Sequence, residues 1–132
     1  MNQKIASLLW LGIEDYTGLR EAVAEILSCH SEMSFVGVQQ ETEKAIMDLA
    51  ISGMIQLYLC QEPVEDETAS PLPYPKCVPY LVDPYWWNQL PVGVPRGEVG
   101  SLKYATTDSG LAAYKDFVGI DDVGPLHVER MP

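Results

Sequence analysis

The sequence predicts a single α+β domain in which a small antiparallel sheet packs against helices. Two segments about fifty residues apart support this fold class. The first, residues 46–58, has the pattern of a helix that ends at Gly53 and turns directly into a strand. The second, residues 102–111, has the pattern of a strand followed by a helix that a threonine caps. The chain has 132 residues and 47% of them are hydrophobic, which suits one domain with a real core.

The N-terminal third is expected to be largely helical. Residues 5–11 are apolar on nearly every side, so their pattern leaves a short buried helix and a strand both open. Residues 15–29 predict a helix with Asp15 as its N-cap. Its expected buried side consists of Tyr16, Leu19, Val23, Ile26 and Leu27. Residues 35–38 are compatible with a short strand or with the start of the next helix.

A second amphipathic segment, residues 39–52, predicts a helix that leads into a strand at residues 54–60. Its expected inward residues are Ala45, Ile46, Leu49, Ala50 and Ile51, and residues 42–44 are expected to point outward. Gly53 stands where a left-handed C-cap is expected, because glycine adopts that conformation without a steric penalty.

Residues 61–100 differ from the rest of the chain and are expected to form a long, largely irregular insertion. Eight of the ten prolines lie between Pro63 and Pro95. The aromatic residues Tyr74, Tyr80, Tyr85, Trp86 and Trp87 crowd into fourteen positions. A short strand over residues 79–82 is compatible with this stretch. Burial in the core and exposure on a binding surface both remain open for the aromatic cluster.

The C-terminal part predicts a strand over residues 99–105, and a helix that Thr107 caps and that continues through Tyr114. We therefore expect one domain over residues 1–118, with the insertion at about 61–100. The tail, residues 119–132, is expected to be loosely ordered.

The charge of the chain limits the partners that it attracts. With 8 Lys and Arg against 19 Asp and Glu, the formal net charge is −11. This field repels nucleic-acid phosphates and attracts a basic partner, although acidity that only maintains solubility is the alternative. The apolar run at residues 5–13 is too short to span a membrane, and the charged residues Glu14, Asp15, Arg20 and Glu21 follow it where an export signal stays uncharged. A cytoplasmic location and no membrane contact are expected.

No catalytic, metal or cofactor motif is evident in the sequence. The three cysteines, Cys29, Cys60 and Cys77, lack the spacing of a disulfide framework or a zinc site. The two histidines, His30 and His127, do not adjoin a nucleophile motif. We therefore expect no cofactor and no enzymatic activity, with an enzyme of unrecognised type as the remaining alternative.

The two junctions resemble those of winged helix-turn-helix domains. In that superfamily the recognition helix commonly ends in Leu-x-x-x-Gly-x-Ile, and the strand after the wing closes with Tyr-x-Leu-Thr-x-x-Gly. Here Leu49, Gly53 and Ile55 match the first pattern. The second is matched by Tyr104, Thr107 and Gly110, with Thr106 in place of the usual leucine. The resemblance implies a three-helix core, a small antiparallel sheet and, here, an enlarged wing rich in proline and aromatic residues.

The resemblance also implies two rival functions. The presumed recognition helix has three acids and one base over residues 39–48, a net charge of −2, which is unfavourable beside phosphates. Our leading hypothesis is therefore protein–protein interaction, with a basic partner or a second copy. Its expected surface consists of Gln39, Gln40, Glu41, Glu43, Lys44, Tyr85, Trp86 and Trp87. The alternative is a dimeric DNA-binding regulator with contacts from Gln39, Gln40, Lys44, Arg96 and Lys103.

Overall fold

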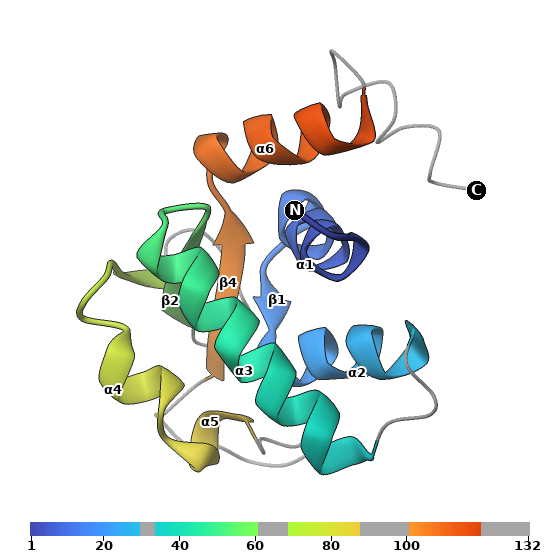
Figure 1. Cartoon of the computed structure of the whole chain (residues 1–132). Coiled ribbons are helices and arrows are strands. Elements are labelled where there is room, and N and C mark those ends of the chain that lie inside the picture. The colour runs from blue at the N-terminus through green and yellow to red at the C-terminus, as the bar shows by residue number, and fades with distance from the viewer. Residues whose placement is uncertain (30–33, 61–68, 88–100, 120–132) are drawn as a thin grey trace.

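The computed structural model describes residues 1–29, 34–60, 69–87 and 101–119. These residues form an α+β fold in which a four-stranded antiparallel sheet, in the order β1-β4-β2-β3, packs against helices (Figure 1). The inward side chains of the central strands, Leu57, Leu102 and Tyr104, are buried among the helices. The predicted α+β class is therefore confirmed.

Residues 5–11, for which the sequence pattern leaves a helix and a strand open, are helical and belong to helix α1 (Gln3–Glu14). Asn2 caps the helix, since its side chain accepts a 2.9 Å hydrogen bond from Ile5 N. The apolar residues on several sides of α1 are explained by its central position, where it contacts α2, α6 and β4. Its buried residues are Ala6, Leu8, Leu9, Trp10 and Gly12.

The expected start of the next helix at Asp15 is wrong. Asp15 ends α1, Thr17–Gly18 form the short strand β1, and α2 spans Leu19–Cys29. Thr17 is buried and pairs with Tyr104 of β4, a long-range contact that local periodicity does not reveal. The Glu21 carboxylate accepts a 3.1 Å hydrogen bond from Gly18 N at the start of α2. Leu19, Val23 and Ile26 are buried as expected.

Helix α3 spans Phe35–Ile51, so residues 35–38 begin this helix rather than form a strand. Ser34 is its N-cap and accepts a 3.1 Å hydrogen bond from Gly37 N. Two expectations about its orientation are wrong. Ile51 is 53% exposed, and Thr42 is buried rather than outward. The Thr42 hydroxyl donates a 2.8 Å hydrogen bond to Val38 O, so the side chain enters the core with its polar group satisfied.

The strands agree closely with the sequence pattern. Strands β2 (Ile55–Cys60) and β4 (Ser101–Thr106) pair along six residues, from Ile55 with Thr106 to Cys60 with Ser101. Strand β3 (Ala69–Leu72) pairs with the other side of β2 and forms the edge of the sheet. A proline is tolerated in β3 because an edge strand has one side without ladder hydrogen bonds.

The described part of the insertion is more ordered than its prolines suggest. Besides β3, it forms the one-turn helices α4 (Val78–Leu81) and α5 (Pro84–Trp87). The strand expected over residues 79–82 is therefore wrong, and Pro79 lies instead in the first turn of a helix, where its missing N–H costs nothing. The remainder of the insertion, residues 61–68 and 88–100, lies outside the described residues.

Helix α6 (Asp108–Val118) follows β4 directly and packs on α1. Thr107 is its N-cap, as predicted, and accepts a 3.2 Å hydrogen bond from Gly110 N. The helix ends at Gly119, which adopts a left-handed conformation with a φ of 78°. The tail expected to be loosely ordered lies, beyond Gly119, outside the described residues.

The two junctions that stand out in the sequence meet in space. Gly53 has the expected positive φ, 78°, at the turn between α3 and β2. Thr107 joins the two segments, since its N–H donates to Met54 O at 3.0 Å and its hydroxyl donates to Gly53 O at 2.6 Å. A Cβ on Gly110 would lie 2.1 Å from Met54 O, so glycine is required for this approach. The two patterns thus form one structural unit.

A second close contact joins β4 to α1. The Tyr104 hydroxyl donates a 2.7 Å hydrogen bond to Leu8 O, and the Thr106 hydroxyl donates one of the same length to Leu9 O. A Cβ on Gly12 would lie 2.6 Å from Thr106 Oγ1, so the absence of a side chain lets the helix approach the strand. These contacts hold α1 against the sheet.

Candidate interaction surface

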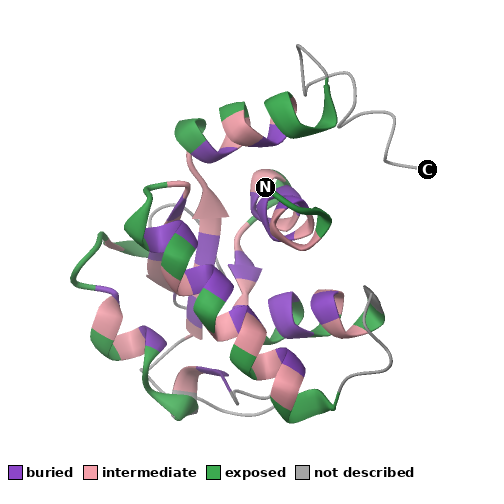
Figure 2. Cartoon of the chain, in the orientation of Figure 1, coloured by how far each residue is buried: buried purple, intermediate pink, exposed green. Residues whose placement is uncertain are grey.

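One side of α3 is exposed or half-buried along the whole helix. We call it the outer face of α3 and define it as Val36, Gln39, Gln40, Glu43, Lys44, Met47, Asp48 and Ile51. Neighbours in this set are spaced by up to four residues, which places them along one side of a helix. The face has apolar ends, with Val36 64% exposed and Ile51 53% exposed, and a polar middle. Exposed residues recur along α3 in Figure 2.

The charges along α3 are partly neutralised by neighbours. Glu41, whose side chain is 42% exposed, forms an ion pair with Lys4 of α1. On the outer face, Gln39 Nε2 donates a 3.3 Å hydrogen bond to the Glu43 carboxylate and orients it. What remains there is one base, Lys44, and two acids, Glu43 and Asp48, a net charge of −1. The outer face is therefore close to neutral, although the chain as a whole is strongly acidic.

The aromatic segment divides between core and surface. Trp87 is 1% exposed, and its Nε1 donates a 2.7 Å hydrogen bond to Leu81 O. The prediction that Trp87 belongs to the interaction surface is therefore wrong. Trp87 fills the core and is not accessible to a partner. Trp86 is half-buried and packs on Tyr80 with ring centroids 5.5 Å apart. Tyr74 is 50% exposed. Residue 85 belongs to α5, but its side chain is outside the description.

Of the residues expected to contact DNA, Gln39, Gln40 and Lys44 lie together on α3, whereas Lys103 lies on β4. Gln40 and Lys44 are exposed one turn apart on α3. Lys103 lies on β4, where its side chain is only 20% exposed and its Nζ is 4.0 Å from the Glu21 carboxylate. Arg96 lies outside the described residues. Two exposed side chains with one positive charge supply little of the phosphate neutralisation that duplex binding requires.

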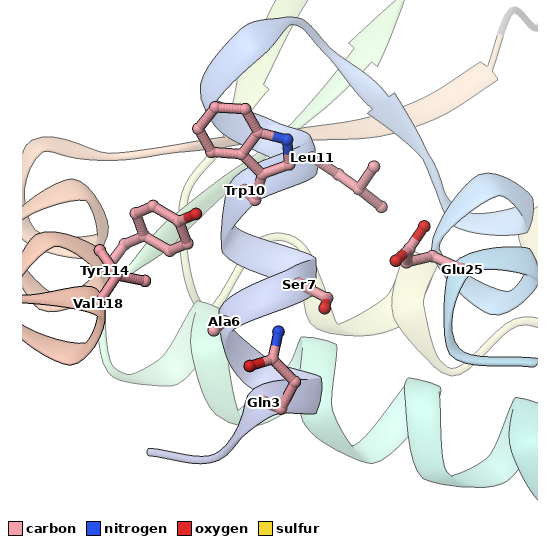
Figure 3. A pocket seen from close by; sticks show the side chains of 8 residues that line it. All are labelled: Gln3, Ala6, Ser7, Trp10, Leu11, Glu25, Tyr114 and Val118. Carbon is pink, nitrogen blue, oxygen red and sulfur yellow. The ribbon is translucent and has the colours of Figure 1, made fainter. Parts of the chain in front are cut away.

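A small pocket lies between α1, α2 and α6, on a different part of the molecule (Figure 3). Its volume is about 120 Å³, whereas small-molecule sites usually enclose about 300–1,000 Å³. Trp10 and Tyr114, whose ring centroids are 5.6 Å apart and whose side chains are nearly fully buried, line it. Gln3, Ser7 and Glu25 give it a polar rim. The pocket is therefore smaller than the usual site for a small molecule.

Groups suited to metal binding or nucleophilic chemistry do not assemble in the described residues. No cluster of three or more His, Cys, Asp or Glu side chains occurs there. The Cys77 thiol is buried, and burial raises its pKa, which disfavours the reactive thiolate. His30 and His127 lie outside the description. Within the described helices, none is both long and apolar enough to cross a membrane.

Comparison with protein-family models, curated proteins and solved structures finds no match for this chain.

The apolar ends of the outer face are not evident from the sequence. The pattern leaves the conformation at Val36 open and predicts that Ile51 points inward, whereas both side chains are exposed. The signal that could have found them is the four-residue spacing of Gln40, Lys44 and Asp48. Val36 lies four residues before Gln40, and Ile51 lies three residues after Asp48, so both fall on the same side of the helix.

Proposed function

We propose that this chain is a small acidic winged helix-like module that acts through protein–protein contact at the outer face of α3. The order α2–α3–β2, a long insertion and then β4 supports the winged helix part of the proposal. The pairing of β2 with β4 and of β4 with β1 supports it too. In this assignment α3 is the counterpart of the recognition helix, and residues 61–100 replace the wing.

One observation favours protein over DNA as the partner of α3. Its outer face combines exposed apolar side chains, Val36 and Ile51, with a nearly neutral polar middle. Exposed aliphatic groups gain free energy when a partner buries them, whereas they gain little beside phosphates. Half-buried Trp86 is a second element of the proposed surface, because tryptophan is enriched at binding hot spots. The partner is then either a basic protein or a second copy of this chain, and the proposed location is the cytoplasm.

A photo-crosslinking experiment tests this function. A photoreactive amino acid is introduced at Gln40, in the middle of the outer face, and the chain is expressed in its native cell. The matched control carries the same amino acid at Ala112, an exposed position on α6. We expect covalent protein adducts from position 40 that are absent from position 112. Equal adducts at both positions, or no protein adduct at position 40, would contradict the proposal.

The competing function is DNA binding, which the exposed pair Gln40 and Lys44 supports. A gel-shift assay with random duplex DNA at physiological salt separates the two functions. We expect no binding at micromolar protein, because few phosphates can be neutralised. Micromolar or tighter binding that weakens steeply with added salt, and that is lost in the Lys44→Glu variant, would favour the DNA-binding regulator instead.

A further inference from the structure

The outer face of α3 is complementary to itself when two copies of the helix lie antiparallel. If Glu43 of one copy lies opposite Lys44 of the second copy, the two-fold symmetry places Lys44 opposite Glu43 of the second copy as well. Two opposite-charge pairs then form at the centre of the contact. The Gln39 amide, which donates to Glu43, holds that carboxylate on the outer face.

The same register matches the rest of the face. Moving outward from the centre, Gln40 meets Met47 of the second copy, and Val36 meets Ile51 of the second copy at each end. The two most exposed aliphatic side chains of α3 would thus bury one another. A single register therefore pairs charge with charge and aliphatic with aliphatic.

We propose that the occupant of this surface is a second copy of the chain, held by antiparallel packing of α3 against α3 around a two-fold axis near residues 43 and 44. This inference rests on the proposed function, because it names the partner of the same face. It also specifies which residues make the contact and in which register.

The size of the contact predicts a weak dimer. Helix α3 has 17 residues and is therefore about 25 Å long. Two such helices packed alone bury less than the roughly 1,000 Å² that a stable interface needs. In addition, each copy has a net charge of −11, so the two copies repel each other at low ionic strength. Salt screens that repulsion, so the dimer should tighten as salt is raised from a low value. A complex with a basic protein should show the opposite dependence.

Sedimentation equilibrium of the purified chain up to about millimolar concentration, at 0.15 M salt, tests the proposal. We expect a monomer–dimer equilibrium in the wild type. The Lys44→Glu variant replaces both central attractions by repulsions and should weaken dimerisation by about tenfold or more. The control Arg20→Glu makes the same charge change at an exposed position on α2 and should leave the equilibrium close to that of the wild type.

A charge-reversed chain tests the register itself. The double variant Glu43→Lys, Lys44→Glu restores both central pairs within its own dimer, so it should dimerise like the wild type. Mixed with the wild type it should not form a heterodimer, because like charges then face each other. A wild type that stays monomeric at millimolar concentration overturns the proposal. So does a Lys44→Glu variant that dimerises as strongly as the wild type.

The outcomes separate this inference from the function on which it rests. If the chain is monomeric but position 40 crosslinks to a different protein, the proposed function holds and the second copy is the wrong partner. If position 40 yields no protein adduct and the chain is monomeric, both fail. If position 40 crosslinks to the chain itself and charge reversal restores dimerisation, both hold.

Discussion

Replacing Gly110 by alanine should break the contact that joins the two junctions of the fold. The new Cβ would lie 2.1 Å from Met54 O and 2.7 Å from Thr106 Cγ2. Neither neighbour can move easily, because Met54 O accepts a 3.0 Å hydrogen bond from Thr107 N and Thr106 is tied to Leu9 O. Either the first turn of α6 shifts away from β2 or the chain turn after α3 opens.

The expected cost follows from three contributions. Overpacking costs roughly 1–3 kcal/mol, and here the upper end applies because the obstacle is backbone. A shift of α6 also stretches the 3.2 Å bond between Gly110 N and the Thr107 hydroxyl, a cap worth about 1 kcal/mol. The higher helix propensity of alanine offsets about 1 kcal/mol. We therefore expect the free energy of unfolding to fall by about 3 kcal/mol.

Urea unfolding followed by tryptophan fluorescence measures this change. The matched control is Ser109→Ala, an exposed position in the same turn, which should change stability by less than about 0.5 kcal/mol. Comparable m-values in the two variants would show that both unfold between similar states. A Gly110→Ala variant within about 0.5 kcal/mol of the wild type would refute the close contact between α6 and the start of β2.

Four further substitutions test other parts of the fold. Gly53→Val should destabilise by more than about 1 kcal/mol in the same urea assay, from backbone strain alone, because φ is 78° and a Cβ at this position would meet nothing within 4 Å. Trp87→Ala should cost roughly 3–5 kcal/mol, whereas Trp86→Ala should cost clearly less, since only Trp87 is fully buried; equal losses would contradict this division. Burial raises the pKa of the Tyr104 phenol, because the folded state favours its neutral form. This contribution to the free energy of unfolding is complete below about pH 10, the pKa of an unfolded tyrosine, and is lost as the pH rises above that value. Tyr104→Phe should therefore lower stability by about 1 kcal/mol at neutral pH and flatten the alkaline decline, measured by urea melts at several pH values.

Local signals were sufficient for much of the architecture. Thr107 and Gly53 are identifiable from sequence as a helix cap and a left-handed turn, and both roles are confirmed. These features depend on hydrogen bonds and backbone angles within a few residues, so they are visible in a short window of sequence. The inward side of α3 at Ala45, Ile46 and Leu49 is predictable for the same reason, because helical periodicity is local.

The failures arise where a partner that the sequence pattern does not reveal decides the conformation or the burial. Thr17–Gly18 form a strand because β4 pairs with them, and Asp15 consequently ends one helix instead of starting another. Residues 78–81 are helical although their composition also suits a strand, because β-propensity is weak and depends on tertiary context. Thr42 has the sequence context of a surface residue, but an internal hydrogen bond to Val38 O allows it to be buried.

For the candidate surface, the sequence by itself determined the charge of the chain and the polar middle of α3, because both are properties of residue type and helical spacing. Tertiary structure alone decided that Glu41 pairs with Lys4, and that Trp87 belongs to the core. It also decided that Val36 and Ile51 remain exposed at the two ends of the face. Exposure depends on which other elements pack against a residue. Those elements can come from distant parts of the chain, since Leu8 and Tyr104, which share a hydrogen bond, are 96 residues apart.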